Sequence, residues 1–291
     1  MGARHPESPQ RLQAIETSLV TAGILARLQR VEAPPASREQ LLRVHEARYL
    51  RHLESVSPAS GTARLDPDTA MNPHSLEAAR RAAGAVVRAT ELVLAGEVRS
   101  AFCAVRPPGH HARPAAAMGF CIFNNVAVGI AHALAAYQLE RVAVVDFDVH
   151  HGNGTEEMFR ADARVLMLDG FQHPYYPYSG TQTRPGYVPL PFAGGSNGAA
   201  YRDAVREHWL PVLKRFRPEL IYISAGFDAH RDDPLAHMKL DEDDYGWLTH
   251  EVRDIAEAYA GGRIVSTLEG GYNLDALGRS VAAHVRMLAD C

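Results

Sequence analysis

From about residue 100 onward, the chain alternates short apolar runs with longer amphipathic stretches. The apolar runs are rich in Val, Ile and Leu and have the length of buried strands. This alternation predicts βαβ units, in which helices cover both faces of a mainly parallel sheet. The runs are 101–105, 141–149, 164–168, 219–227 and 263–271, and the helical stretches are 124–137, 154–159, 200–216, 241–260 and 277–290.

The first part of the chain is expected to be helical. Glycine and proline are spread along the sequence and mark no linker, and no internal repeat stands out. We therefore expect one α/β domain covering residues 1–291, a length that a single large core can accommodate. The expected N-terminal helices are 11–25 after Ser8 and Pro9, 41–53 after a capping box of Ser37 and Gln40, and 75–96.

Composition excludes several classes of protein. Lys and Arg number 30 against 34 Asp and Glu, so no basic surface for nucleic acid is indicated. The N-terminal residues contain no apolar signal segment, and no apolar run reaches the roughly 20 residues of a membrane span. Cys103, Cys121 and Cys291 are too widely spaced for a disulfide framework, which fits a reducing compartment. We expect a soluble cytoplasmic protein that binds neither nucleic acid nor membrane.

Polar residues and glycines follow four of the apolar runs. They occupy residues 106–111, 146–154, 225–230 and 269–272. The carboxyl ends of parallel strands share one edge of the sheet, which is where α/β proteins form their sites. The sequence therefore predicts one site that is assembled from these four segments.

Asp146, Asp148 and His150 are spaced by two at the end of one run. If the backbone stays extended, their side chains leave on one face. Neighbouring carboxylates repel unless a cation or donors compensate, so we interpret the pattern as a metal site with Asp228 as a further ligand. Carboxylates and imidazole without a thiolate suit catalytic Zn²⁺, and also Fe²⁺ or Co²⁺. The alternative is that both aspartates cap the next helix while His150 lies in a turn.

Three further residues have side chains suited to proton transfer or oxyanion stabilisation. The tandem His110 and His111 suggest acid and base catalysis, because imidazole titrates near neutrality. Tyr272 follows two glycines at a strand end, where its phenol could donate to a developing oxyanion. The alternatives are that the histidine pair is structural and that the phenol packs in the core.

Five motifs in a fixed order resemble a known family. They lie at 106–112, 119–125, 145–155, 224–230 and 268–272, and the segments 5–12 and 65–73 extend the similarity. Together they resemble the histone deacetylase superfamily, nearest to its class II-like bacterial amidohydrolases. The resemblance implies the arginase/deacetylase fold, a single three-layer α/β domain around a mainly parallel sheet of about eight strands, with Zn²⁺ at the strand ends.

The resemblance also implies a role for individual residues. In the family, aromatic side chains form the walls of a tunnel that holds the aliphatic stem of an acylated lysine. The matching positions are Asp148, His150 and Asp228 as metal ligands, His110 and His111 as the catalytic pair, Tyr272 as the transition-state tyrosine, Asp146 behind His110, Asn153 behind His111, and Phe120, Tyr176, Leu235, Gly119 and Gly271 around the substrate. Because Asn153 is an amide where class I members have an aspartate, we expect a lower pKa for His111.

The chain departs from the family pattern in two respects. Relatives usually carry a strand ahead of the segment that begins at His5, so we expect the first strand of the sheet to be missing. The segment 31–35 would then lack a neighbouring strand and offer an edge for oligomerisation. Asp169 stands where a serine is common at a structural K⁺ site, so the resemblance supports K⁺ binding only weakly.

The function implied by the resemblance is hydrolysis of an amide by metal-activated water. The expected substrate is an acyl-lysine protein or peptide from which an acetyl or other short acyl group is removed. One alternative is an acetylpolyamine amidohydrolase acting on small acylated amines. Leu235 stands where polyamine-selective relatives tend to place a glutamate that holds the distal ammonium, although Asp232 and Asp233 lie close by in sequence and could replace it. A second is a catalytically silent acyl-lysine binding module, which would not require Tyr272 or the histidine pair.

Overall fold

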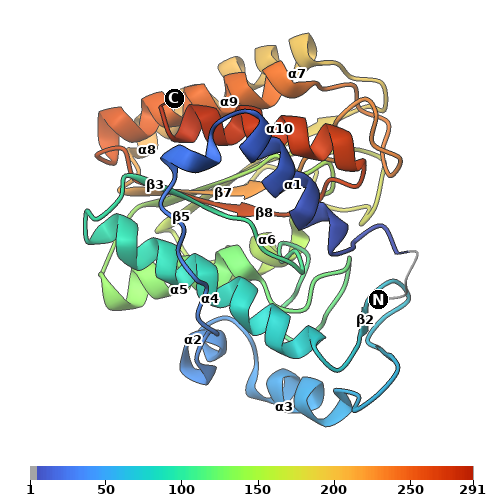
Figure 1. Ribbon diagram of the computed structural model, residues 1–291. Coiled ribbons are helices and arrows are strands. Elements are labelled where there is room, and N and C mark those ends of the chain that lie inside the picture. Colours follow the sequence, from blue (N-terminus) through green and yellow to red (C-terminus); the bar gives the residue numbers. More distant parts are fainter. Residues whose placement is uncertain (1–4, 291) are drawn as a thin grey trace.

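A computed structural model describes residues 5–290 as a central sheet between two layers of helices (Figure 1). The sheet has six strands in the order β3-β8-β7-β4-β5-β6, and all neighbouring pairs are parallel. A separate antiparallel pair precedes residue 75. The strands are β1 (Ala63–Arg64), β2 (Ala70–Met71), β3 (Ser100–Cys103), β4 (Val142–Asp146), β5 (Val165–Gln172), β6 (Tyr187–Phe192), β7 (Leu220–Ala225) and β8 (Ile264–Leu268).

Helices from both ends of the chain cover one face of the sheet, and helices from its middle cover the other (Figure 1). The first face carries α1 (Gln10–Thr21), α7 (Gly198–Ala204), a π-helical turn (Val205–Trp209), α8 (Leu210–Phe216), α9 (Glu242–Tyr259) and α10 (Leu274–Leu288). The second carries α4 (Ser75–Leu94) and α5 (Asn125–Ala136), against which α2 (Arg38–Leu42) and α3 (Ala47–Val56) pack. A short 3₁₀ turn (Leu25–Arg27) follows α1, and α6 (Asn153–Phe159) follows β4.

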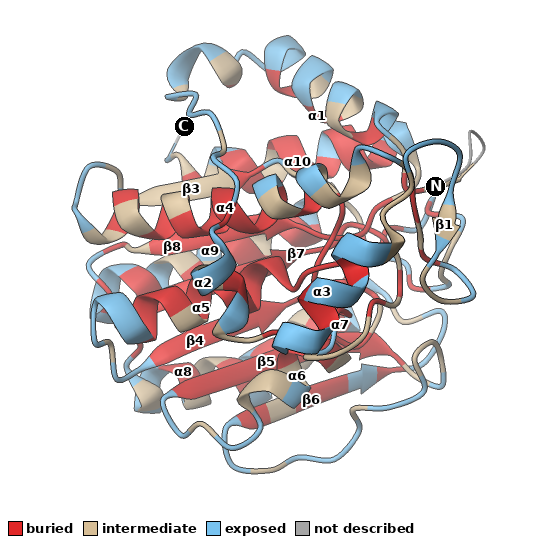
Figure 2. Ribbon diagram, turned by 90° about the horizontal axis from the view of Figure 1, so that it is seen from below, coloured by how far each residue is buried: buried red, intermediate tan, exposed pale blue. Residues whose placement is uncertain are grey.

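Strand β4 shows why both faces need a layer of helices. Val142 and Val144 pack with α4 and α5, whereas Ala143 and Val145 pack with α1, α9 and α10. All four side chains are completely buried. A strand that is apolar on both sides is stable only where both faces are covered, and the sheet accordingly lies in the buried interior of Figure 2.

The expected helix over 41–53 is divided into α2 and α3. Its predicted capping box is confirmed, since Gln40 N donates to Ser37 Oγ and Ser37 N donates to Gln40 Oε1. Beyond it, the ring of His45 accepts a hydrogen bond from Asn124 N at Nε2 and donates to Arg113 O from Nδ1. These contacts are made to distant parts of the chain, so the local sequence pattern could not reveal the interruption.

The sheet contains six strands within residues 5–290, fewer than the roughly eight that the resemblance predicts. The sequence pattern also missed β6, because Pro189 and Pro191 interrupt its apolar run. A proline removes a backbone donor, which an edge strand tolerates. The position of β6 at the edge, paired only with β5, resolves the apparent conflict.

The segment 31–35 forms no part of the sheet, so the expected exposed strand edge is not found there. It runs along α4 instead: Ala36 N donates to Arg80 O over 2.8 Å, and a Cβ at Gly84 would lie 1.9 Å from Pro34 O. The helix therefore needs a glycine at this position to let the two backbones approach.

Two other expectations concern cysteines and membrane spans. Cys103 and Cys121 are buried and free, and Cys291 lies outside the described residues. Among residues 5–290, none of the helices combines the length and the apolar character needed to cross a bilayer.

A buried histidine joins β8, α9 and α10. His284 on α10 is hydrogen-bonded to Thr249 Oγ1 through Nδ1 at 2.6 Å and to Ser266 Oγ through Nε2 at 2.8 Å. Its side chain has no solvent exposure, and burial lowers its pKa to about 3. The folded protein therefore keeps this imidazole neutral at pH values where the unfolded chain protonates it.

We expect acid to destabilise the protein through His284. As pH falls below about 6.5 the unfolded state gains a proton that the folded state excludes, which costs about 2.5 kcal/mol by pH 4.5. Urea unfolding of wild type and His284→Gln at pH 7 and pH 4.5 measures how much unfolding free energy each protein loses between the two pH values. The variant should lose less stability between the two pH values, and an equal loss would contradict the assignment.

Candidate active site

The four polar segments meet at one edge of the sheet, as their positions after parallel strands require. The segments follow β3, β4, β7 and β8, which are adjacent in the sheet order. All of these strands point the same way, so their carboxyl ends deliver the segments to the same place.

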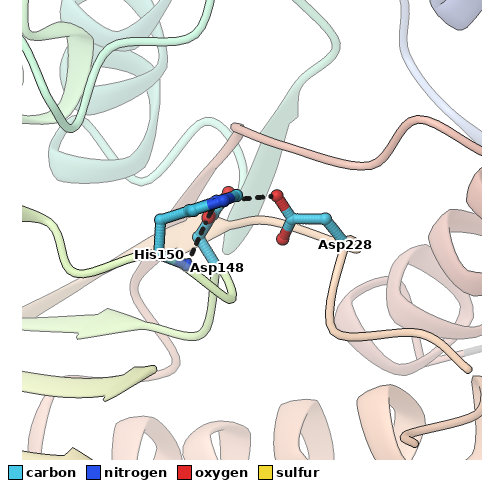
Figure 3. A group of neighbouring side chains, drawn as sticks. All are labelled: Asp148, His150 and Asp228. Atoms are coloured by element: carbon cyan, nitrogen blue, oxygen red, sulfur yellow. Dashed lines mark hydrogen bonds and ion pairs between the residues drawn. The ribbon is translucent and has the colours of Figure 1, made fainter. Parts of the chain in front are cut away.

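Asp148, His150 and Asp228 form a compact group of possible metal ligands (Figure 3). One ligand atom from each residue lies within 4.8 Å of the others. His150 Nδ1 is 3.0 Å from Asp148 Oδ1 and 3.2 Å from Asp228 Oδ2. Asp146 was expected to point the same way, but its carboxylate turns toward His110.

The group has the features that a divalent cation needs. Asp228 Oδ2 is buried, and apart from its ion-pair contact with His150 Nδ1 at 3.2 Å it has no hydrogen-bond partner among the described residues. Glycines make room for the two carboxylates, because a Cβ at Gly226 would lie 2.1 Å from Asp148 Oδ2 and one at Gly270 would lie 2.1 Å from Asp228 Oδ2. Two carboxylates and one imidazole match the ligands of catalytic zinc sites, in which a further coordination position stays open for water or substrate. These residues therefore fit the metal that the resemblance implies.

Backbone amides orient the two carboxylates, and burial raises the pKa of one of them. Gly270 N donates to Asp148 Oδ2 at 2.8 Å, and Val149 N donates to Asp228 Oδ1 at 2.9 Å. Burial, together with the negative charge of Asp148, raises the pKa of Asp228. A bound cation would remove this penalty by compensating the charge of both groups.

The adjacent histidines have different partners. His110 Nδ1 lies 3.0 Å from Asp146 Oδ2, and His111 Nδ1 lies 2.8 Å from Asn153 Oδ1. Burial disfavours the charged form of His110, but Asp146 and Asp148 outweigh it and hold its pKa well above the usual value. Burial and the neighbouring charges of His110 and His150 hold the pKa of His111 well below it. The surroundings thus favour the charged form of His110 and the neutral form of His111.

Tyr272 is held by contacts from two other parts of the chain. Asp233 Oδ2 accepts a hydrogen bond from Tyr272 N at 2.6 Å. Arg11 Nε on α1 donates to Gly271 O at 2.7 Å, and its guanidinium carbon lies 5.1 Å from the centroid of the tyrosine ring. Burial raises the pKa of Tyr272 well above 10, so the phenol keeps its proton for donation. The sequence pattern gave no role to the buried Arg11, although the family-like segment 5–12 contains it.

A cavity of about 290 Å³ leads to these residues, and aromatic side chains form its walls. Phe120 packs edge-on against Tyr272 with ring centroids 5.9 Å apart, and Tyr176 packs edge-on against His111 at 5.3 Å. Gly119 has a φ of +56°, and a Cβ there would lie 2.2 Å from the ring of His111. The cavity is lined by Asp68, Pro108, His110, His111, Gly119, Phe120, His150, Tyr175, Tyr176, Tyr178, Leu235, Gly270 and Tyr272.

Most of the predicted substrate-binding residues line this cavity, with one exception. Gly270 forms part of the wall, whereas Gly271 does not and instead presents its carbonyl to Arg11. The sequence pattern missed Tyr175 and Tyr178, which lie close to the predicted Tyr176. It also gave no role to Asp68, although the family-like segment 65–73 contains it.

Three acidic residues near the cavity differ in whether their carboxylates are already engaged by other groups. Asp233 is almost fully buried and accepts hydrogen bonds from the backbone of Leu235, Tyr272 and Asn273. Asp232 is exposed and lies 3.6 Å from Arg279. Asp68 lines the cavity, and its Oδ1 accepts from Gly119 N at 3.1 Å.

Asp169, which bears on the K⁺ expectation, is completely buried beside β4. Its Oδ2 accepts from Gly152 N at 3.1 Å and from Tyr187 Oη at 3.3 Å, while its Oδ1 has no hydrogen-bond partner. Burial and the charge of Asp146 raise the pKa of Asp169 well above its usual value. Binding of K⁺ near this residue stays a prediction, which the resemblance supports only weakly.

Comparison with protein families identifies the chain. A family model described as the histone deacetylase domain matches residues 5–288. A histone deacetylase-like amidohydrolase from Pseudomonas aeruginosa is 45% identical over 279 residues, which cover 93% of this chain and 73% of the relative. A probable deacetylase from Archaeoglobus fulgidus is 38% identical over 280 residues, covering 93% of this chain and 77% of the relative.

A solved structure shows that the fold is shared as well. The crystal structure of the HDA15 HD domain superposes with a TM-score of 0.93 at 36% sequence identity. The match covers 100% of this chain and 85% of the other. The predicted single three-layer α/β architecture is therefore confirmed, apart from the smaller number of strands.

The metal assignment predicts the result of removing one ligand. Asp228→Ala should lose bound metal, because only two protein ligands would remain to hold the ion. The metal content of purified wild type and variant can be measured by plasma mass spectrometry. Asp244→Asn, which alters a carboxylate paired with Arg202, serves as the control and should retain the metal. Full occupancy in Asp228→Ala would contradict the assignment.

Proposed function

The chain belongs to the histone deacetylase family, and we propose that it is a zinc-dependent amidohydrolase acting on acylated lysine side chains. The reaction would release acetate or another short acid and leave a free amine on a protein or peptide. The observation that carries this proposal is that three metal-ligand residues, a histidine pair and Tyr272 surround the end of one aromatic cavity.

The proposed metal ligands are Asp148, His150 and Asp228. A zinc ion held there would polarise the acyl carbonyl and lower the pKa of bound water from about 15.7 toward 7. The chain provides for this by burying both carboxylates and by fixing each with a backbone amide.

His111 is placed to act as the general base. Its Nδ1 proton is engaged by the amide oxygen of Asn153, so Nε2 is the unprotonated nitrogen. The lowered pKa keeps this nitrogen free at neutral pH, ready to accept a proton from the attacking water. An imidazolium of the pair then protonates the leaving amine. Asp146 keeps His110 oriented and favours its charged form.

Tyr272 is placed to stabilise the acyl oxygen as it becomes negatively charged. Its raised pKa means that it donates a proton in a hydrogen bond and does not act as a phenolate. Arg11 and Asp233 fix the backbone on both sides of this residue. Such fixed placement matters because an oxyanion donor acts only if it is already in position when charge develops.

The cavity walls favour the stem of a neutral acyl-lysine. Phe120, Tyr176 and Leu235 offer apolar surface, and burial of four methylenes there would contribute about 3 kcal/mol. Asp233 is engaged by backbone amides, and Asp232 is an exposed residue beside Arg279. Neither lines the cavity, so neither is placed to hold a distal ammonium there. Asp68 is the remaining carboxylate at the cavity, which makes a direct comparison with polyamine substrates the appropriate test.

We expect zinc-loaded protein to hydrolyse a fluorogenic acetyl-lysine peptide. Removing the metal with a chelator should abolish turnover, and adding zinc back should restore it, because the metal activates the water. A loaded wild-type protein without turnover would contradict the proposed activity and favour a binding module. Undiminished turnover after complete metal removal would contradict its metal dependence.

The same assay separates the two substrate classes. The kcat/KM for the acetyl-lysine peptide should exceed that for N-acetylputrescine or acetylspermidine, because a charged chain would lose hydration in this cavity without gaining a free partner. Asp68, the carboxylate that lines the cavity, already accepts hydrogen bonds from Gly119 N and Thr69 Oγ1. Leu235→Glu should narrow the difference by supplying a free partner. A clear preference of the wild type for the polyamines would overturn this choice of substrate.

A separate prediction concerns the pH profile. A carboxylate behind His111 would stabilise its imidazolium, so Asn153→Asp should raise the pKa of His111. A general base works in its neutral form, and the acid limb of kcat/KM should therefore move to higher pH by about one unit. Steady-state rates between pH 5 and 9 test this, and a profile that superposes on the wild type would contradict the role of His111.

A further inference from the structure

Glu269 is a buried carboxylate beneath the histidine pair that the proposed chemistry does not use. It follows β8 and has no solvent exposure. One of its oxygens, Oε2, accepts two backbone hydrogen bonds, from Gly109 N at 2.6 Å and from His110 N at 3.1 Å. Its other oxygen lies 3.4 Å from Ser224 Oγ.

The other backbone groups of this loop are held by different elements. Asn125 on α5 donates to Pro107 O at 3.0 Å, and Gly154 N on α6 donates to His110 O at 3.0 Å. Those contacts fix the carbonyl groups on either side of Gly109. Among the described residues, Glu269 is the partner that takes up the two N–H groups between them.

The loop has little freedom to find another arrangement. A Cβ at Gly109 would lie 2.4 Å from Asn125 N, so the backbone passes directly over the start of α5. Without an acceptor, the N–H groups of Gly109 and His110 would be buried and unsatisfied, which carries a large desolvation penalty. Relief of that penalty would require the loop, and the ring of His110 with it, to move.

We propose that Glu269 is a positioning residue that holds the backbone of Gly109 and His110 and thereby keeps the His110 ring against Asp146. This inference rests on the proposed function for its effect on turnover, while the backbone contact itself stands apart from that function. The ionised carboxylate makes stronger hydrogen bonds than a neutral group, since charge-assisted bonds are about twice as strong. Ionisation of Glu269 should therefore tighten the loop.

The surroundings of Glu269 place its ionisation within the working pH range. Burial raises its pKa to about 7, with His110 lowering it and Asp146 raising it. Burial and the charge of Glu269 raise the pKa of the Cys121 thiol, and Arg11 on α1 donates to the main-chain oxygen of Glu269. Lowering the pH from 8 to 6 should convert most of Glu269 to the neutral acid, which is a weaker acceptor.

Two substitutions separate charge from hydrogen bonding. Glu269→Gln keeps an oxygen for the two amides but removes the charge, and Glu269→Met keeps the approximate length but removes the acceptor. Hydrogen exchange of the peptide 104–112 should rise in the order wild type, Gln, Met. This readout does not depend on activity, so it tests the contact even if the proposed deacetylase function fails. If the Met variant does not fold, the Gln variant still carries the test.

Turnover should follow the same order. We expect kcat to fall about tenfold in Glu269→Gln at pH 8 and about 100-fold in Glu269→Met, with KM and metal content close to wild type, because small misplacements of catalytic groups have effects of this size. At pH 6 the wild-type glutamate is mostly protonated, so the ratio of wild type to Gln should shrink to about twofold. A purely structural role would lower kcat without changing this ratio.

Asp244→Asn is the matched control. Asp244 is also a nearly buried carboxylate, but it accepts a hydrogen bond from Arg202 and caps α9. Its variant should show wild-type exchange in 104–112 and a wild-type pH profile. The proposal is overturned if Glu269→Gln and Glu269→Met leave both exchange and kcat unchanged, or if the control alters them equally. A kcat ratio that stays constant with pH would overturn the part assigned to charge.

Discussion

The whole site depends on how negative charge is buried at the carboxyl edge of the sheet. Asp146, Asp148, Asp228 and Glu269 are at most 1% exposed, although isolated buried carboxylates are strongly unfavourable. Each has a specific compensation: an imidazole, backbone N–H groups, or the place left for a cation. Gly226 and Gly270 contribute by their missing side chains, because a Cβ at either position would collide with the carboxylate of Asp148 or Asp228. Charge compensation thus determines the path of the loops as well as the chemistry.

The same constraint gives two identical residues different roles. His110 is backed by the carboxylate of Asp146, and its pKa is raised. His111 is backed only by the amide of Asn153, which does not offset burial and the charges of His110 and His150, so its pKa is lowered. A pair of imidazoles with pKa values on opposite sides of neutrality can present an acid and a base at one pH. The assignment follows from the partners and could not follow from the tandem histidines alone.

Sequence patterns predicted those residues of the site that have other site residues close by along the chain. Asp148 and His150 follow a strand, and the resemblance placed them with Asp228 before any geometry was known. Glu269 and Arg11 were missed as functional residues, because Glu269 holds a backbone 160 residues away and Arg11 one 260 residues away. Contacts of that range leave no periodicity in the sequence. The fold shows the same division: β4 was evident from its apolar run, whereas the proline-containing β6 becomes intelligible only as an edge strand.

Both segments to which we assign catalytic roles are held through their backbones by residues outside the reacting group. Asp233 takes the amide of Tyr272, and Glu269 takes those of Gly109 and His110. Tyr272 and His110 lie on loops, which are normally the more mobile parts of a fold. A buried carboxylate that accepts hydrogen bonds from several backbone amides gives such a loop the fixed geometry of a strand or helix. Moving the loop would leave those buried N–H groups without an acceptor. Precision at this site is therefore a property of the carboxylates beneath the loops as much as of the side chains that face the substrate.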